Sequence, residues 1–144
     1  MAKKATDDAV ANQVFIGCPW KTVRPKYERI VDRLNKKYPL SFVIVGRRDG
    51  QEAEELLTII KQRLSTSAFA IFDATQGNAN VSLELGFSEA ADIPRAIYIS
   101  SHAASRRNAT DGAIISDLAG KKHNPYNQER GLAQLLAEFA KTHN

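Results

Sequence analysis

Residues 68–99, AFAIFDATQGNANVSLELGFSEAADIPRAIYI, contain one complete strand–helix–strand unit. The unit starts with an apolar run over residues 68–72, which predicts a strand that ends at Asp73. A polar loop over residues 74–80 leads into a helical pattern, and residues 96–99 form a second apolar run. Apolar runs of strand length without alternation are typical of parallel strands that are covered on both faces. This stretch therefore predicts two parallel strands joined by a crossover helix.

The same alternation extends over the rest of the chain. Apolar runs at residues 13–17 and 41–45 predict further strands, and a brief strand is expected near Tyr126. Apolar residues at helical spacing predict three more helices, over residues 27–38, 53–64 and 132–139. Strands that alternate with helices form a doubly wound sheet, because crossovers between parallel strands are right-handed. The predicted fold class is α/β, a doubly wound, flavodoxin/Rossmann-like parallel sheet of four to five strands with helices on both faces.

Length and composition indicate one folded domain. The chain has 144 residues, of which 43% are hydrophobic and 25% are charged, so it can bury a core and is not a disordered polymer. We expect a flexible tail over residues 1–11 and a single domain over residues 12–144. The single cysteine excludes a disulfide framework and suits a reducing compartment. The polar N-terminus and the lack of a run of about eighteen apolar residues predict a cytoplasmic protein.

Positive charge is spread along the sequence, with a net charge of +4. The basic residues come as separated pairs: Lys3-Lys4, Lys36-Lys37, Arg47-Arg48, Arg106-Arg107 and Lys121-Lys122. A nucleic-acid binder usually gathers its basic residues on one face, often with aromatic residues between them. Sequence spacing does not determine whether these pairs converge, and an anionic small molecule would satisfy the same charge. The pattern disfavours nucleic acid as a partner.

Four segments follow the predicted strands at the edge where a doubly wound sheet binds its ligands, the carboxyl ends of its strands. They are residues 17–20, residues 46–49, residues 73–80 with the helix after them, and the long polar stretch over residues 100–120. The sequence contains neither a G-x-G-x-x-G fingerprint nor a P-loop. We expect the functional site among these four segments.

Glu84 lies about one turn inside the helix that follows residues 73–80, between two leucines. Either Asn78 or Asn80 is placed to cap this helix, and Asn80, Glu84 and Ser88 would share one of its faces. Apolar neighbours raise the pKa of a carboxylate, whereas a nearby helix N-terminus lowers it. Such a group could stabilise developing positive charge or act as a nucleophile. The alternative is a solvated helix residue, and spacing alone leaves both interpretations open.

One part of the sequence resembles a known signature. Residues 72–75, Phe-Asp-Ala-Thr, and residues 78–90, Asn-Ala-Asn-Val-Ser-Leu-Glu-Leu-Gly-Phe-Ser-Glu-Ala, resemble the pattern D-x-T…N-x-N-V-x-x-E-L-G-x-x-x-A. This pattern is typical of the nucleoside 2-deoxyribosyltransferase-like and TIR-like superfamily, whose order of elements is similar over about residues 14–139. Asn80-Val81 departs from both subfamilies, since NAD-cleaving TIR enzymes often carry Trp or Cys there and deoxyribosyltransferases often carry Gly-Thr. The resemblance therefore lies between the two.

The resemblance implies chemistry at an N-glycosidic bond. The matching helix glutamate, Glu84, would attack or stabilise the anomeric carbon as a base or nicotinamide leaves. A further set of residues would bind the substrate: Gly17, Cys18, Trp20, Arg47, Arg48, Asp73, Asn78, Asn80 and Ser88. In this set, Asp73 and Asn80 would hold sugar hydroxyls or orient Glu84. Arg47 and Arg48 would meet a phosphate. The substrate would be NAD or another nucleotide, with no separate cofactor.

The resemblance also implies partners and a setting. Relatives tend to assemble, so a homo-oligomer, a signalling partner protein and a role in bacterial antiphage defence are expected. The three histidines show no metal-ligand spacing, so no metal is expected, and Cys18 has no sequence motif that would make it a nucleophile. Two other interpretations stay open: a non-catalytic nucleotide-sensing or protein-interaction module of the same fold, and a basic adaptor for nucleic acid.

Overall fold

Five parallel strands form the sheet. The computed structural model describes residues 10–18, 23–44, 53–75, 79–100 and 123–143. The strands are β1 (Val10–Gly17), β2 (Ser41–Ile44), β3 (Ser67–Asp73), β4 (Arg95–Ser100) and β5 (His123–Tyr126). They lie in the order β2-β1-β3-β4-β5, and every neighbouring pair is parallel. In this flavodoxin-like order, the direction of winding reverses between β1 and β3.

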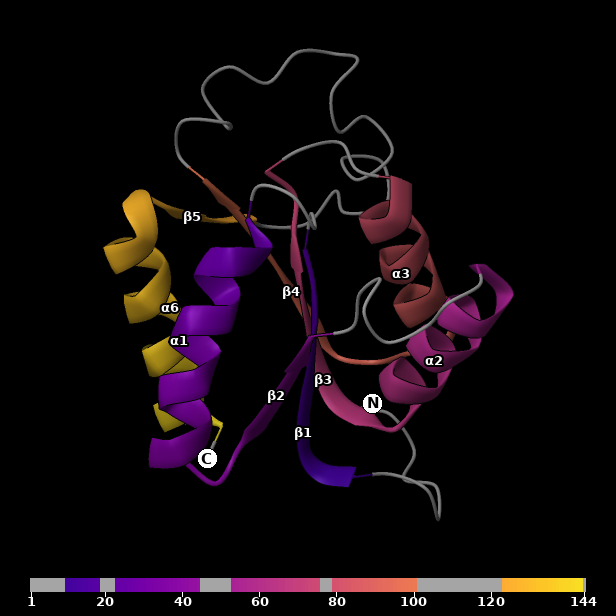
Figure 1. Ribbon diagram of the computed structural model, residues 1–144, viewed down its shortest axis with the longest axis horizontal. Coiled ribbons are helices and arrows are strands. Elements are labelled where there is room, and N and C mark those ends of the chain that lie inside the picture. Colours follow the sequence, from indigo (N-terminus) through magenta and orange to yellow (C-terminus); the bar gives the residue numbers. More distant parts are fainter. Residues whose placement is uncertain (1–9, 19–22, 45–52, 76–78, 101–122, 144) are drawn as a thin grey trace.

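Helices cover both faces of the sheet (Figure 1). In the described parts of the chain they are α1 (Arg24–Lys37), α2 (Ala53–Ser65), α3 (Ala79–Ala90) and α6 (Gln128–Thr142). α1 and α6 pack together on one face, at the left of Figure 1, and α2 and α3 pack together on the other. The predicted fold class is confirmed, with five strands. None of the helices in the described ranges combines the length and the apolar character needed to cross a membrane.

The sequence explains where α1 begins and which face it buries. Pro25 lies in the first turn, where its missing N–H leaves no helical hydrogen bond unmade. Lys36 and Lys37 lie in the last turn, where the helix dipole favours positive charge. The buried residues follow helical spacing: Tyr27, Ile30, Val31 and Leu34. The Tyr27 hydroxyl bonds to Asp73, the last residue of β3, so the first turn of α1 lies close to the carboxyl edge of the sheet.

Some element boundaries differ from the predicted ones. β1 begins at Val10, so residues 10 and 11, which were expected in the tail, belong to a strand because Val10 pairs with Ser67 of β3. α6 begins at Gln128, ahead of the predicted start at Leu132. Of the long polar stretch over residues 100–120, only Ser100 lies among the described residues, where it ends β4. Val45 and the predicted loop over residues 46–49 lie outside them.

The sheet divides the core into two layers. Ile71 and Tyr98 belong to the layer under α1 and α6, whereas Phe15 and Phe72 belong to the layer under α2 and α3. Successive residues of a strand point to opposite faces, so the position of a residue along β3 determines its layer. Asp73, the residue after Phe72, therefore points toward α1 and α6.

Each edge strand of the sheet has a residue that reduces the number of free backbone groups. At the β2 edge, the side-chain amide of Asn35 donates to the Phe42 carbonyl at 3.1 Å and accepts from the Phe42 N–H at 2.8 Å. At the other edge, β5 carries Pro125, which has no N–H. Uncovered edge strands present free backbone groups to other chains, and both of these strands present fewer of them.

Candidate active site

Glu84 lies directly over the carboxyl end of β1. A Cβ atom placed on Gly17 would overlap Glu84 Oε1 and would stand 2.8 Å from Phe72 Cδ1. Gly17 and Phe72 are also partners in the β1–β3 register, so the carboxylate lies where these two strands end side by side. Doubly wound sheets bind their ligands at this point, where the winding reverses. The structure thus brings together two of the predicted site residues, Gly17 and Glu84.

The Glu84 carboxylate is buried, and none of the described residues donates a hydrogen bond to it. The residue is only 3% exposed, and this burial raises the pKa of its carboxyl to about 8. The interpretation of Glu84 as a solvated helix residue is therefore wrong. Desolvation of a carboxyl group costs folding free energy, and such groups cluster at functional sites.

Asp73 ends the neighbouring strand but points to the other face of the sheet, toward α1 and α6. The Tyr27 hydroxyl donates to Asp73 Oδ2 at 2.7 Å, and the Tyr126 hydroxyl donates to the same oxygen at 2.8 Å. The Thr75 N–H donates to Asp73 Oδ1 at 2.8 Å. Asp73 and Glu84 therefore lie on opposite faces of the sheet, with the carboxyl ends of β1 and β3 between them.

The bonds to Asp73 bear on its predicted role. Burial raises the pKa of Asp73, and the hydrogen bonds from Thr75, Tyr27 and Tyr126 oppose that rise because they favour the ionised form. The resemblance implied that Asp73 would hold sugar hydroxyls or orient Glu84. Both of its oxygens instead accept bonds from the protein, so that role stays a prediction that these contacts do not support.

Cys18 follows Gly17, and the charges of Asp73 and Glu84 both affect the pKa of its thiol. Its side chain is buried, and this burial raises the pKa of the thiol far above its usual value. The charges of Asp73 and, to a smaller extent, Glu84 add to the rise, whereas Arg24 opposes it. The thiol is therefore protonated at neutral pH, which makes it a poor nucleophile.

The other predicted site residues fall into two groups. Ser88 is fully buried, and its hydroxyl donates to the Leu85 carbonyl at 2.7 Å within α3. Its own carbonyl accepts the Ile93 N–H near the start of β4, so Ser88 lies toward the amino edge of the sheet, away from Glu84. α3 begins at Ala79, so residue 80 lies within the helix and not ahead of it. The remaining predicted groups lie outside the described residues: Trp20, Arg47, Arg48, Asn78 and the side chain of Asn80.

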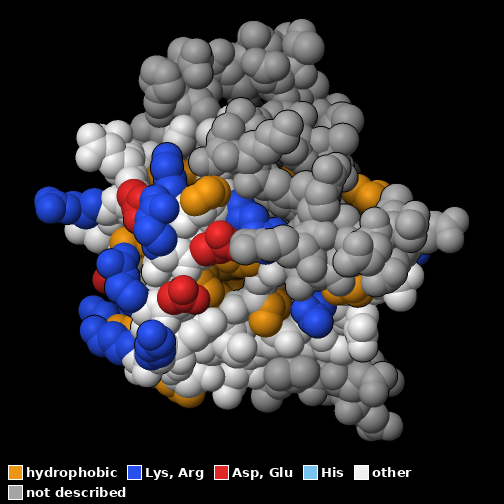
Figure 2. Space-filling view, in the orientation of Figure 1, with side chains coloured by type: hydrophobic (Ala, Val, Ile, Leu, Met, Phe, Trp, Pro, Cys, Tyr) orange, Lys and Arg blue, Asp and Glu red, His pale blue; other side chains and the backbone are white. Residues whose placement is uncertain are grey.

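The described basic side chains gather on α1 (Figure 2). Arg29, Arg33, Lys36 and Lys37 are exposed there, on the side that Figure 1 assigns to α1 and α6. Lys36-Lys37 is the only predicted basic pair within the described ranges. It lies in the last turn of α1, at the opposite end of that helix from the site. Within those ranges, no three His, Cys, Asp or Glu side chains stand close enough to hold a metal ion.

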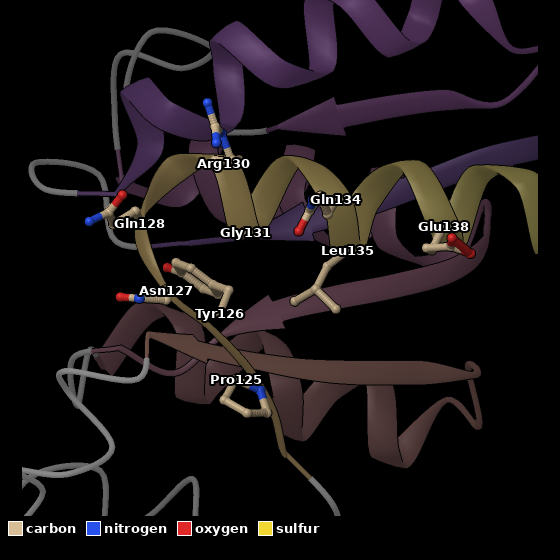
Figure 3. A pocket seen from close by; sticks show the side chains of 9 residues that line it. All are labelled: Pro125, Tyr126, Asn127, Gln128, Arg130, Gly131, Gln134, Leu135 and Glu138. Carbon is tan, nitrogen blue, oxygen red and sulfur yellow. The ribbon is translucent and has the colours of Figure 1, made fainter.

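A groove of about 480 Å³ lies between β5 and α6 (Figure 3). It is lined by Pro125, Tyr126, Asn127, Gln128, Arg130, Gly131, Gln134, Leu135 and Glu138. None of these is a predicted site residue, and the two charged ones, Arg130 and Glu138, are exposed. Tyr126 connects the groove with Asp73, because it lines the groove and its hydroxyl donates to the Asp73 carboxylate. The groove lacks the buried charge that distinguishes the Glu84 site.

Sequence reasoning missed the partners of Asp73. Tyr27 was assigned to an apolar helix face and Tyr126 to a brief strand, yet both phenols donate to one carboxylate. A signal was available, since a buried tyrosine hydroxyl normally finds a hydrogen-bond partner. The D-x-T spacing also has a local cause, because the Asp73 side chain accepts the N–H two residues on, as aspartates in turns commonly do.

The fold of this chain is similar to that of TIR domains and of a CMP N-glycosidase, as comparison with solved structures shows. The TIR domains of the activated Roq1 resistosome, which directly recognises the pathogen effector XopQ, match with a TM-score of 0.64 and 10% identity over 89% of this chain and 98% of that chain. The CMP N-glycosidase BcmB of Clostridium botulinum matches with a TM-score of 0.63 and 11% identity over 88% of this chain and 98% of that one. A conserved protein from Enterococcus faecalis V583 matches with a TM-score of 0.60 and 9% identity over 90% of this chain and 99% of that one.

These similarities describe the fold and leave the activity open. No protein-family model and no curated protein matches the sequence. At 9–11% identity, structural similarity shows the architecture alone, because proteins of one architecture have many different functions.

Proposed function

We propose that this chain cleaves the N-glycosidic bond of NAD or of another nucleotide, with Glu84 as the catalytic carboxylate. The observation that carries the proposal is the place of Glu84, a buried carboxylate held over Gly17 where β1 and β3 end side by side. The resemblance of residues 72–90 to the superfamily signature supports it. Further support comes from the likeness of the fold to a CMP N-glycosidase.

The chemistry follows from where charge develops. As the bond between C1′ and the base nitrogen breaks, the bonding electrons leave with the base and the sugar becomes oxocarbenium-like. A fixed negative charge on Glu84 would lower this barrier, and it would act strongly because water is excluded around it. Water or another acceptor then bonds to C1′ and loses a proton. A base that leaves as an anion takes up that proton, whereas nicotinamide leaves NAD as a neutral molecule and the proton passes to solvent. Glu84 acts in its ionised form in this scheme.

A second candidate function is nucleotide binding without turnover. It is favoured by the pKa of Glu84, because a carboxyl group with a pKa of about 8 is mostly protonated at neutral pH before a ligand arrives. A protonated carboxyl would donate a hydrogen bond to a ligand instead of stabilising positive charge. Binding with no release of base would identify this function.

The setting and the partners are part of the proposal. The nucleotide is the ligand, self-association completes the active form, and a signalling protein in a defence response receives the signal. The likeness of the fold to the TIR domains of a resistosome supports assembly and such a setting. Sedimentation with and without nucleotide tests assembly directly, and a monomer at every concentration would contradict it.

The activity is tested by incubating the full chain with NAD and a panel of nucleosides and nucleotides. Released base is separated by chromatography, with a Glu84→Gln sample run beside the wild type. Release by the wild type alone supports the proposal and names the substrate. Ligand binding without release favours the second candidate, and neither binding nor release at high protein concentration contradicts both.

The pH dependence of the reaction is expected to follow Glu84. Its pKa is raised to about 8, and the ionised form is the active one, so kcat/KM should rise about tenfold per pH unit below that value and level off above it. Initial rates at limiting substrate between pH 5.5 and pH 9.5 measure this profile. A profile that falls as pH rises would instead make Glu84 a proton donor to the leaving base.

A further inference from the structure

One buried carboxylate ties together the ends of three strands and the first turn of α1. Tyr27 of α1 and Tyr126 of β5 both donate to Asp73 Oδ2, at 2.7 and 2.8 Å. Thr75 donates its N–H to Asp73 Oδ1, and its hydroxyl lies 3.2 Å from the Tyr126 hydroxyl. The Ser100 N–H, at the end of β4, donates to Thr75 Oγ1 at 3.1 Å. We call these five residues the Asp73 cluster.

Asp73 is closed to direct contact with a ligand. It is 0% exposed, and both of its oxygens already accept hydrogen bonds from the protein. Tyr27 and Tyr126 each have a single O–H, and each gives it to this carboxylate. A sugar hydroxyl could reach Asp73 only by displacing one of these donors, which would leave a buried phenol without its partner.

The Asp73 cluster stands at the same edge as the Glu84 site. Asp73 directly follows Phe72, whose ring lies beside the Glu84 carboxylate at Gly17. Cys18 directly follows Gly17 and packs in the same core layer as Tyr27 and Tyr126, and the charges of Asp73 and Glu84 both raise the pKa of its thiol. A shift of the strand ends would therefore change the packing around Cys18.

We propose that Asp73 is a positioning residue, which holds the ends of β3, β4 and β5 and the start of α1 in the arrangement that the substrate of Glu84 requires, without touching that substrate. This inference rests on the proposed function. It replaces the role of sugar ligand that the family resemblance implied for Asp73. Asp73 would restrain β5 and β4 through the hydrogen bonds of Tyr126 and Thr75, which join these strands to the carboxylate.

The inference is tested with Asp73→Asn, Tyr126→Phe and the double variant. Tyr126→Phe removes one hydroxyl from the cluster and keeps the ring, so it remains informative if Asp73→Asn fails to fold. Tyr98→Phe is the matched control, because Tyr98 is equally buried on the adjoining strand and in the same layer but makes no hydrogen bond to Asp73. All variants are made in the full chain.

The first measurement is turnover. A positioning role predicts that Asp73→Asn and Tyr126→Phe each lower kcat by about 10- to 100-fold, that their double variant loses little more, and that Tyr98→Phe is close to wild type. The preference between ribo- and 2′-deoxyribonucleotide substrates should stay the same in all of them. A change in that preference in Asp73→Asn alone, or full additivity of the two losses, would overturn the inference.

The second measurement does not depend on activity. Cys18 is the only cysteine of the chain and is buried in the same core layer as Tyr27 and Tyr126, so its rate of reaction with a thiol reagent reports local opening of this edge of the sheet. Asp73→Asn and Tyr126→Phe are expected to raise that rate about tenfold or more, and to raise it beyond their effect on global unfolding. Tyr98→Phe is expected to leave the rate unchanged.

These two measurements separate failure of the inference from failure of the proposed function. If the wild type releases no base, the proposed function fails, and the thiol rates still show whether Asp73 holds the edge. If base is released but the thiol rates of the cluster variants match the wild type, the inference fails alone. Thiol rates that rise only in proportion to global unfolding would also overturn it, because Asp73 would then stabilise the whole fold and not this edge.

Discussion

Glu84→Gln is expected to lower kcat/KM for base release by about 10³-fold or more. Glutamine keeps the length of the side chain over Gly17 but offers no negative charge to an oxocarbenium-like sugar. Released base under single-turnover conditions measures the loss of chemistry separately from binding. Glu138→Gln is the matched control, because Glu138 is an exposed glutamate on α6 and should lose nothing. Retained activity in Glu84→Gln would remove Glu84 from the chemistry.

The same substitution is expected to stabilise the folded chain at alkaline pH. Burial raises the pKa of Glu84 from 4.5 to about 8, so between these values the folded state keeps a proton that the unfolded state has released. The free energy of unfolding of the wild type therefore falls as pH rises through this range, by at most about 5 kcal/mol in total. Glu84→Gln lacks this fall, so its advantage should be absent at pH 4 and largest at pH 9.

Urea unfolding of both proteins at several pH values checks this effect on stability. The expected outcome is a protein that gains stability while it loses turnover, as happens when a functional group is held in a costly environment. Parallel pH profiles for the two proteins would mean that the carboxyl group of Glu84 is not desolvated in solution.

Gly17→Ala is expected to lower turnover by about 100-fold with a smaller effect on folding. The new Cβ would overlap Glu84 Oε1 and would stand 2.8 Å from Phe72 Cδ1, so the carboxylate must leave its place over β1. Displacement of a catalytic group by about 1 Å costs rates of this order. The crowding should lower the free energy of unfolding by about 1–3 kcal/mol. Base release and urea unfolding measure the two effects.

The chain offers a matched control for this substitution. Gly86→Ala makes the same change on α3, where a Cβ would meet no atom within 4 Å, and it should be neutral or stabilising by about 0.5–1 kcal/mol. Gly17→Ala should also cost less stability in a Glu84→Ala background, since the overlapping oxygen is gone. Equal costs in both backgrounds would contradict the close approach of Glu84 to Gly17.

The sequence predicted the fold well because periodicity is a local property. The apolar runs at residues 13–17 and 68–72 appear as β1 and β3, and the carboxyl-edge rule then directs attention to Gly17, Asp73 and Glu84. It did not predict that Asp73 and Glu84 face opposite layers. Alternation along β3 was visible in the sequence, but which helices cover which face depends on strand order.

The Asp73 cluster could not be predicted from the sequence for a related reason. Tyr27 and Tyr126 lie 46 and 53 residues from Asp73, and only the packing of α1 and β5 against β3 brings the three together. The phosphate contact predicted for Arg47 and Arg48 and the substrate contact predicted for Trp20 lie outside the described residues, and they stay predictions. Ser88 shared a helix face with Glu84 as expected, yet a full turn of α3 carries it toward the opposite edge of the sheet.

The two hydrogen bonds between the Asn35 side chain and the Phe42 backbone bear on how copies of this chain can associate. A side-chain amide already occupies both backbone groups of Phe42 on the outer side of β2, and Pro125 removes a donor from β5 at the far edge. In the described residues, both edge strands therefore offer fewer backbone groups to a strand from a neighbour. Contacts through helix faces and strand ends would leave each sheet with its own five strands. Such contacts can be made and undone without unfolding a subunit, which suits a reversible assembly better than a permanent one.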